Sequence, residues 1–390
     1  MTHERRGCAL ALGAAAAILG VVVVVVGCEP VPSPSPASTT AATASDVPEI
    51  TAAPTAFDPS AVTIETLDPR YVPANAATSA PGQILWTAGS GRASEIWRFV
   101  PGTQPPERIY VTPRADGHLS SIVASSAGYA FVEESDREFG KGGWRLWFLT
   151  APGEEPIEMD RGAAPGAGVA PTIALDERRL AWASFDEPSS GPRSRLRVAP
   201  VEDLRSVTTL LDAPIEARLL WYPALSGDVL WYGTIKADFV GTADPEYHLE
   251  HIDLSQPGAR PVRFPGLALD FNPALNARYL VWKTNTQGDS ALNWGTLHVL
   301  DRQSGETSAI PIERANRPSI GNRFVAFDEI THKRLGVYDL ATARLVDLAG
   351  EVGGTWTYGG ISLSGRLLTF YTQAADGTGL PQIRWAILPE

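Results

Sequence analysis

The feature that most constrains the fold is a pair of residues that recurs seven times between residues 84 and 370. Each pair is an apolar residue, then any residue, then a large aromatic residue, and successive aromatics are 43 to 51 residues apart. A period of this length is typical of repeat proteins in which four short strands form one unit. The pairs are Ile84/Trp86, Tyr129/Phe131, Leu180/Trp182, Val229/Trp231, Leu280/Trp282, Val325/Phe327 and Leu368/Phe370.

Short strands and tight turns surround each pair in a constant order. In the fourth repeat, residues 223 to 225 begin a strand, a Ser-Gly turn follows, and residues 228 to 232 form a second strand with Val229 and Trp231 on one face. A third strand, another tight turn and a fourth strand come next. Four antiparallel strands in each of seven repeats predict an all-β, seven-bladed β-propeller.

The two ends of the repeat region complement each other. The seventh repeat has a third strand at residues 382 to 388 and no fourth strand before Glu390, which leaves an unpaired sheet edge. Residues 61 to 67, ahead of the first repeat, alternate apolar and polar side chains as a strand does. We therefore expect this N-terminal strand to complete the last blade and close the ring.

The repeat sequences resemble the TolB-like and tryptophan–aspartate repeat (WD-repeat) propellers, whose blades carry a proline, an apolar residue, a Ser/Gly turn and an apolar-x-aromatic strand. The resemblance covers roughly residues 61 to 390. It implies the propeller fold. The chain differs from the TolB-like pattern at the turn, where only Ser226/Gly227 and Ser364/Gly365 stand in place of Ser-Pro-Asp-Gly. No partner in the Tol system is therefore carried over.

The N-terminal segment has the form of a secretory signal. Arg5 and Arg6 precede an uncharged apolar run from Ala9 to Val26. The end of that run, Val25-Val26-Gly27-Cys28, resembles the lipobox of bacterial lipoproteins, which implies removal of residues 1 to 27 and a diacylglycerol on Cys28. The alternative is an uncleaved signal anchor, because eighteen to twenty apolar residues nearly span a bilayer.

Three segments follow from these patterns: a signal peptide at 1 to 27, a disordered tether at 28 to 60 and the propeller at 61 to 390. The tether is rich in Pro, Ser, Thr and Ala, so it buries too little apolar surface to fold. Acylated Cys28 would hold the protein in the lipid bilayer, on the extracytoplasmic side of a bacterial cell membrane. Only Cys8 and Cys28 occur in the chain, so we expect no disulfide in the mature domain.

The charge balance argues against one class of partner. The chain has 32 Lys and Arg against 44 Asp and Glu, a formal net charge of −12. A strongly acidic protein repels a phosphate backbone, so we expect no nucleic-acid partner.

Loop lengths and side-chain types predict where a ligand binds. Loops between second and third strands are long, for example at residues 233 to 246, and lie on the same face as the connections between blades. Those connections carry aromatic residues beside Asp, Asn and Arg, as sugar and peptide sites do, although Trp221 and Phe271 also suit a wedge between blades. The predicted ligand-binding residues are Trp221, Tyr222, Asp270, Phe271, Asn272, Arg317, Trp356 and Tyr358.

No catalytic or metal-ligating pattern is recognisable, and none indicates a cofactor. His248 and His251 are three apart, which places them on opposite faces of a strand and excludes joint metal binding. The sequence therefore predicts a non-catalytic binding or scaffold module, not an enzyme, for a protein or polysaccharide partner on the long-loop face. The alternative is a polysaccharide hydrolase or lyase, with Asp270 as the rim carboxylate. A third possible role, that of a purely structural spacer, is not excluded by the sequence.

Overall fold

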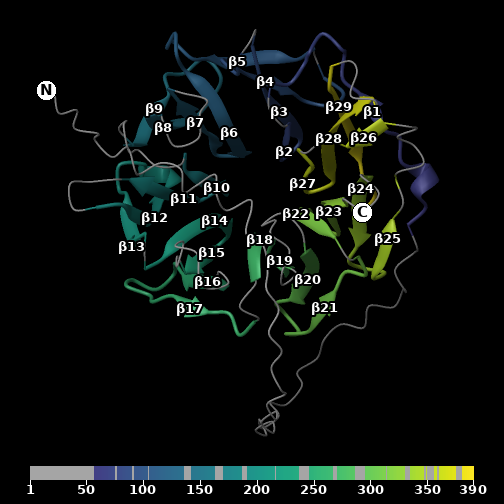
Figure 1. Cartoon of the computed structure of the whole chain (residues 1–390). Helices are drawn as coiled ribbons and strands as arrows, with labels where there is room; N and C mark the ends of the chain where they lie inside the picture. The colour runs from purple at the N-terminus through teal and green to yellow at the C-terminus, as the bar shows by residue number, and fades with distance from the viewer. Residues whose placement is uncertain are drawn as a thin grey trace, which may run out of the picture.

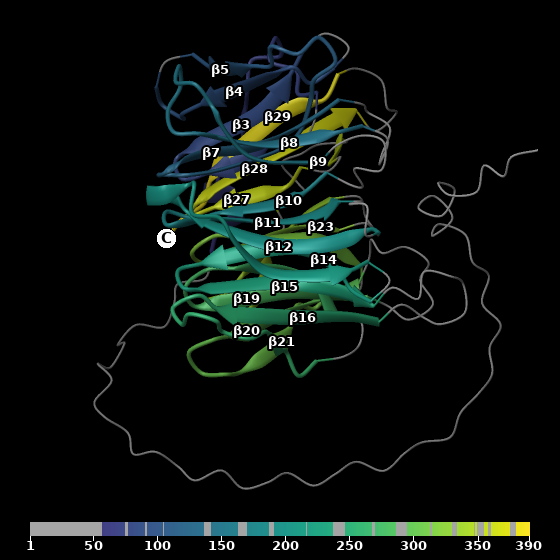
Figure 2. The same ribbon diagram turned by 90° about the vertical axis from the view of Figure 1, so that its left-hand side faces the viewer.

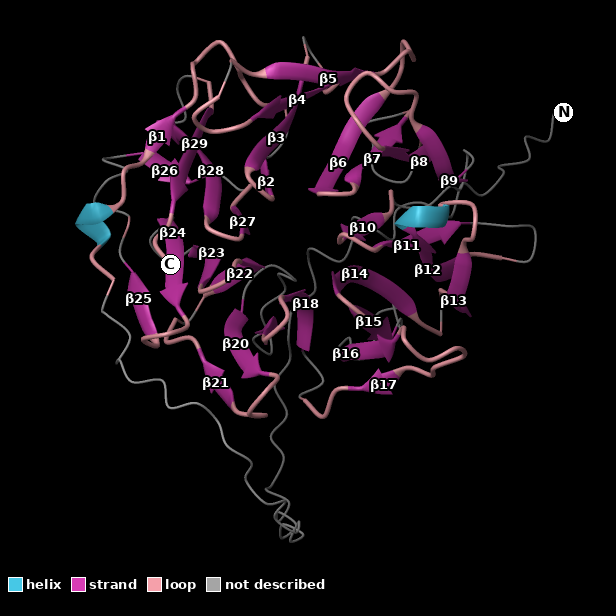
Figure 3. Cartoon of the chain, turned by 180° about the vertical axis from the view of Figure 1, so that it is seen from behind, coloured by secondary structure: helices cyan, strands magenta, loops and turns pink. Residues whose placement is uncertain are grey.

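A computed structural model of the chain forms a ring of small antiparallel sheets around a central axis (Figure 1). The structure describes residues 57–74, 77–89, 92–103, 105–135, 142–162, 170–186, 191–215, 217–236, 246–266, 270–285, 295–312, 314–329, 334–346, 348, 355–357, 360–374 and 380–390. The described residues contain two short 3-10 helices, η2 (Pro59–Ala61) and η3 (Val201–Asp203), and otherwise strands, turns and loops (Figure 3). The all-β prediction is confirmed.

The strands group into seven units, numbered blades 1 to 7, which fits the predicted blade count. Blade 1 comprises β2 (Thr78–Ala80), β3 (Gln83–Ala88), β4 (Glu95–Phe99) and β5 (Glu107–Val111). Blade 2 comprises β6 (His118–Ser125), β7 (Gly128–Glu134), β8 (Trp144–Leu149) and β9 (Ile157–Gly162). Blade 3 comprises β10 (Thr172–Leu175), β11 (Arg179–Asp186), β12 (Arg193–Pro200) and β13 (Thr208–Pro214).

The remaining blades follow around the ring in sequence order (Figure 1). Blade 4 comprises β14 (Leu219–Ser226), β15 (Val229–Lys236), β16 (Glu246–Asp253) and β17 (Val262–Arg263). Blade 5 comprises β18 (Asp270–Leu275), β19 (Tyr279–Asn285), β20 (Gly295–Asp301) and β21 (Thr307–Ala309). Blade 6 comprises β22 (Ala315–Ile320), β23 (Phe324–Glu329), β24 (Arg334–Asp339) and β25 (Arg344–Val346). A single bridge, Gly295 to Ala315, joins blades 5 and 6 into one eight-stranded sheet.

Blade 7 is built from both ends of the propeller region. It comprises β26 (Thr355–Thr357), β27 (Ser362–Ser364), β28 (Leu367–Ala374), β29 (Gln382–Ile387) and β1 (Glu65–Thr66). β1 pairs antiparallel with β29, and the Leu67 N–H donates to the Ile383 carbonyl at 2.9 Å. The predicted closure by an N-terminal strand is therefore confirmed. At the inner edge, the Ser79 hydroxyl of blade 1 donates to Thr369 of blade 7 at 2.7 Å.

In every blade the first strand lies nearest the axis, and in the edge-on view the strands run from one face of the ring to the other (Figures 1 and 2). Each blade therefore has two faces covered by its neighbours. Val132 and Trp144 of blade 2, for example, pack with Leu180 and Trp182 of blade 3 in a buried cluster. Similar clusters occupy the other blade interfaces, so the apolar core is divided among them.

The recurring aromatic residues are buried at these interfaces, with one correction in blade 4. Leu225 pairs with Leu230 there, as Leu275 pairs with Leu280 in blade 5. The equivalent pair in blade 4 is therefore Leu230 and Tyr232, one residue beyond the predicted Val229 and Trp231. Both faces of the second strand are buried, so consecutive positions along it are apolar. The apolar-x-aromatic pattern can therefore be placed on this strand in two ways, one residue apart. The aromatics of the other repeats, all buried as predicted, are Trp86, Phe131, Trp182, Trp282, Phe327 and Phe370.

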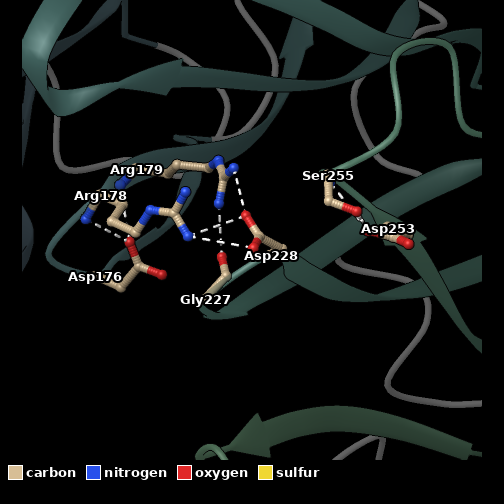
Figure 4. Close-up of polar contacts among 7 residues, drawn as sticks. All are labelled: Asp176, Arg178, Arg179, Gly227, Asp228, Asp253 and Ser255. Atoms are coloured by element: carbon tan, nitrogen blue, oxygen red, sulfur yellow. Dashed lines mark hydrogen bonds and ion pairs between the residues drawn. The ribbon is translucent and has the colours of Figure 1, made fainter.

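The short turns are fixed by carboxylate and amide side chains. Asp176 Oδ1 accepts the N–H groups of Arg178 and Arg179, each at 2.8 Å, as expected for an Asp-initiated turn. In Figure 4 both arginines point toward Asp228 of the next blade, whose carboxylate pairs with the two guanidinium groups at 3.1 and 2.7 Å. Arg179 also donates to the Gly227 carbonyl at 2.7 Å. These contacts bind the turn of blade 3 to the turn of blade 4.

Candidate functional site

Three neighbouring blades carry the same unusual backbone feature in their innermost strands. Tyr222, Asn272 and Arg317 have φ values of 46°, 52° and 49°, a left-handed conformation that residues other than glycine seldom adopt. Each precedes a proline, and each lies at a register shift in its strand. A β-bulge of this kind redirects a side chain out of the regular alternation.

Such a backbone costs stability, on the order of 1–3 kcal/mol at each residue. In the described part of the chain only one other non-glycine residue has positive φ, Ala343 in the turn between β24 and β25. Gly360 of blade 7 also has positive φ, at 70°, in the position equivalent to Tyr222. Strained residues that persist in adjacent, equivalent positions indicate a functional site.

The three bulges form one wall of a pocket of about 400 Å³ at the inner edge of blades 4 to 6. Pockets of this size bind small molecules or a few residues of a chain. Its lining residues are Trp221, Tyr222, Pro223, Ile235, Phe271, Asn272, Pro273, Asn316, Arg317 and Pro318.

Aromatic rings make up the blade 4 side of the pocket. Trp221 and Tyr222 stack with ring centroids 5.4 Å apart, and Tyr222 contacts the edge of Phe271 at 5.3 Å. Phe271 is buried, while Tyr222 is 39% exposed. The Tyr222 N–H donates to the Thr172 hydroxyl of blade 3 at 3.1 Å, which supports the strained backbone. These rings give the site a flat apolar surface with one accessible face.

Polar groups make up the blade 6 side. The Lys283 ammonium, fully buried, donates to Asn316 Oδ1 at 3.2 Å, and the Asn272 amide nitrogen approaches the same oxygen at 3.5 Å. Arg317 is exposed and makes no ion pair with a described carboxylate. The pocket therefore joins an aromatic surface to an amide and a cation.

The charge of Arg317 extends across the pocket. Burial raises the pKa of the Tyr222 phenol, and the positive charge of Arg317 opposes part of that rise. Burial also raises the pKa of the Asp328 carboxyl in blade 6, and Arg317 opposes that rise as well. The guanidinium thus lies within electrostatic reach of both sides of the site.

A second pocket, of about 310 Å³, follows the inner strands of blades 1 to 3. It is lined mainly by hydroxyl-bearing and β-branched side chains. Tyr222 lines both pockets, so the two adjoin at this ring. The aromatic pocket thus adjoins a second pocket along the axis.

Five of the eight residues predicted to bind a ligand lie together at this pocket. Trp221, Tyr222, Phe271, Asn272 and Arg317 all line the pocket, although they lie within β14, β18 and β22 and not in the connections ahead of them.

One other predicted residue, Asp270, does not line the pocket. Asp270 is 3% exposed and accepts a hydrogen bond from the Thr284 hydroxyl at 2.6 Å, so it is a buried structural carboxylate and not a rim group. Trp356 lies in β26, and its backbone pairs with Gln373. Tyr358 lies outside the described residues. So do Cys28 and the middle of each long loop.

Sequence reasoning missed Asn316 and the prolines Pro223, Pro273 and Pro318. A signal was present, because a proline stands at the same place in three successive repeats. It follows a large polar or aromatic residue each time. The left-handed backbone ahead of each proline is not readable from residue type, since the residue before proline normally prefers an extended conformation.

Two kinds of feature are absent from the described residues. These residues contain no group of three or more His, Cys, Asp or Glu side chains arranged to hold a metal ion. They also contain no helix long and apolar enough to span a bilayer.

No protein-family model and no curated protein match the chain, but solved structures do. The β-propeller domain of the Trilobed protease from Pyrococcus furiosus matches with a TM-score of 0.56 and 10% identity, covering 81% of this chain and 95% of that one. A prolyl endopeptidase matches at 0.55 and 10%, covering 79% and 46%. The tricorn protease matches at 0.51 and 10%, covering 68% and 29%.

These similarities show the propeller fold. The chain spans less than half of the prolyl endopeptidase and tricorn chains that it matches. The Trilobed protease propeller is described as having an open velcro topology, whereas the present ring is closed by pairing of β1 with β29.

The comparisons overturn two predictions. The chains that match in fold include tricorn, prolyl endopeptidases and puromycin hydrolase, which are enzymes, so the prediction of a non-catalytic scaffold is corrected. The expectation that the protein is not an enzyme is corrected on the same ground. Both predictions depended on the absence of a recognisable catalytic motif from the blades, and one fold can serve many chemistries. What these matches share with the chain is a β-propeller found in peptidases.

Proposed function

We propose that this protein acts in peptide hydrolysis and that its propeller binds the peptide substrate in the pocket of blades 4 to 6. The observation that carries the proposal is the set of three strained, equivalent residues on one pocket wall, Tyr222, Asn272 and Arg317. The names of the matching peptidases supply the reaction class, as a likeness of fold.

The chemistry of the pocket suits a peptide. Aromatic faces at Trp221 and Tyr222 take apolar or prolyl side chains, and amide and guanidinium groups hydrogen-bond to carbonyl and carboxylate oxygens. The volume of about 400 Å³ accommodates a few residues.

The test is a peptide mixture incubated with the full chain, with cleavage and binding followed by mass spectrometry and calorimetry. We expect Tyr222→Ala to weaken peptide binding about tenfold, because the accessible aromatic face is lost. Val262→Ala, which removes a 54% exposed side chain on the outer strand β17, is the control and leaves binding unchanged. A full chain that neither binds nor cleaves any peptide contradicts the proposal.

A lipid anchor on Cys28 is part of this proposal, with a bacterial cell membrane as its location and the bilayer as its partner. It rests on the lipobox-like sequence before Cys28 and on the tether that follows. We also propose, from the repeat sequences alone, that the blades are related to those of TolB-like and WD-repeat propellers. Mass spectrometry of the mature protein tests the anchor: we expect a diacylglyceryl thioether at residue 28 and its loss in Cys28→Ser, and an unmodified cysteine argues against it.

A further inference from the structure

We propose that the pocket of blades 4 to 6 recognises a carboxylate on the bound peptide, with Arg317 as its ligand. This inference rests on the proposed function and specifies the substrate class. The carboxylate has two sources in a peptide, the free C-terminus and an acidic side chain, and both have the same chemistry.

Arg317 is placed where a ligand reaches it. Its side chain is exposed at the pocket, and no described carboxylate forms an ion pair with it. Several other arginines of this acidic protein are paired, as Arg278 is with Asp301 at 2.7 Å and Arg323 is with Asp339 at 2.7 Å. A planar guanidinium without a partner presents the geometry that binds a carboxylate through two hydrogen bonds.

The backbone holds Arg317 in this position. Its φ of 49° and the register shift between Asn316 and Ser319 turn the side chain out of the strand alternation. Pro318 fixes its own φ, so the backbone next to Arg317 has little freedom to relax the bulge. The cation is therefore preorganised, which reduces the entropy that binding must overcome.

The neighbouring amides have a defined orientation. The Lys283 ammonium only donates, so the Asn316 atom that faces it at 3.2 Å is the amide oxygen. The Asn272 amide nitrogen faces the same oxygen at 3.5 Å, which directs the Asn272 oxygen away from Asn316. Asn272 thus offers an acceptor to a group in the pocket.

Two buried polar atoms of the pocket wall have no hydrogen-bond partner among the described residues, the Asn272 Oδ1 acceptor and the Trp221 Nε1–H donor. Unpaired buried polar atoms also occur elsewhere in the described blades, for example Trp86 Nε1 and Trp282 Nε1, and the Asn272 and Trp221 atoms are distinguished by bordering the pocket. A peptide unit carries one N–H donor and one C=O acceptor, which match this pair. Beside a carboxylate on Arg317, an apolar side chain of the same peptide fits against Tyr222 and Phe271.

The experiment compares three peptides of the same apolar sequence with the full chain by calorimetry. One has a free C-terminal carboxylate, one is C-terminally amidated, and one is amidated with an aspartate in place of the last residue. We expect the free acid or the aspartate peptide to bind at least tenfold more tightly than the neutral amide, and the stronger of the two identifies the source of the carboxylate. The advantage should shrink as salt is added, because an ion pair at an exposed side chain is screened.

Arg317→Gln should abolish the affinity advantage of the charged peptides over the neutral amide, because their carboxylate loses its cationic partner. Arg344→Gln, at an exposed arginine of the outer strand β25, is the charge-matched control and should preserve the advantage. Asn272→Leu should weaken the binding of all three peptides to a similar degree, and this distinguishes the contribution of the amide from that of the ion pair. Urea unfolding of each variant establishes that it is folded.

The outcomes separate the inference from the proposed function. If all three peptides bind equally well to the unmodified chain, carboxylate recognition is wrong and the peptide-binding proposal stands. If none of them binds, the peptide-binding proposal fails and carboxylate recognition fails with it. If Arg317→Gln and Arg344→Gln reduce the advantage equally, the effect belongs to net charge and the assignment to Arg317 is overturned.

Discussion

At the scale of single residues, the costliest feature of this protein is the left-handed backbone at Tyr222, Asn272 and Arg317. Glycine adopts this conformation without a steric penalty, yet none of the three is glycine. All three side chains line the pocket: Tyr222 contributes an aromatic ring, Asn272 an amide and Arg317 a cation. We infer that the side chains are kept for binding at the expense of stability, a trade commonly found at functional sites.

This trade gives a prediction at Arg317. In a regular strand, glycine is less stable than alanine by roughly 0.5–1 kcal/mol. At φ 49° the order should reverse, so that Arg317→Gly is more stable than Arg317→Ala by about 1 kcal/mol, because only alanine carries a strained Cβ. Urea unfolding measures the difference. The same pair of changes at Ser319, in the same strand without positive φ, should show the ordinary order, and an identical order at both positions would argue against strain.

At the scale of strands, close approach between blades shapes the pocket. Gly233 in β15 lies under the Phe271 ring of blade 5, and a Cβ added there would be 2.6 Å from the nearest ring carbon. Phe271 in turn supports Tyr222. The glycine therefore allows the aromatic wall to approach the sheet of blade 4.

Gly233→Ala should destabilise the protein by about 1–3 kcal/mol, since an overpacked interface must shift. The Tyr222 ring, which contacts Phe271, should move as well. Chemical denaturation measures the first effect, and a crystal structure of the variant shows the second. In a Phe271→Leu background the cost of Gly233→Ala should fall, because the smaller side chain leaves room. An unchanged cost in that background would show that the ring is not the obstacle.

A second pairing at this scale makes stability depend on pH. His251 stacks on Trp231 at 4.6 Å and His298 on Trp282 at 5.3 Å, in each case between a third and a second strand. Burial lowers the pKa of both imidazoles below the ordinary value of 6.5. As pH falls below 6.5, the unfolded chain therefore binds protons that the folded chain resists, and the free energy of unfolding decreases.

We expect the urea midpoint to drop between pH 7.5 and pH 5.5. The drop should be smaller in a His251→Phe, His298→Phe double variant, which keeps the stacking and removes the titration. Equal drops in both proteins would assign the acid sensitivity to other groups.

Sequence patterns predicted the blades because each one repeats an aromatic strand at a near-constant period. They failed in blade 4, where Trp231 and Tyr232 are both buried and the alternation has two solutions. Five of the eight predicted ligand-binding residues line the pocket, since aromatic, amide and cationic side chains cluster there. Asp270 does not, because its carboxylate is buried against Thr284, and burial of a charge depends on contacts between strands that no local pattern records.

At the scale of the whole molecule, the ring depends on a junction between its two ends. β1 completes blade 7 at the rim, and Ser79 of blade 1 bonds to Thr369 of blade 7 at the inner edge. Leu67 contributes to both the pairing and the core, since its N–H donates to Ile383 and its side chain is 5% exposed. The junction thus combines a sheet edge with a packed interface.

Leu67→Pro removes the N–H donor and the buried side chain together, so we expect a loss of about 3–5 kcal/mol of stability. It should also expose the edge of β29 and promote self-association, which analytical ultracentrifugation detects. Leu67→Ala keeps the backbone bond and should destabilise the protein without self-association. Matching sedimentation of the two variants would show that the edge remains covered.

Because the first described strand is also the outermost strand of the last blade, mechanical tension applied to the N-terminal side of the chain is delivered to this junction. β1 spans only Glu65–Thr66, so its bonds to β29 are few and share the load poorly. Under such tension β1 should separate from β29 and open the ring at blade 7 first, while each remaining blade keeps all four of its own strands.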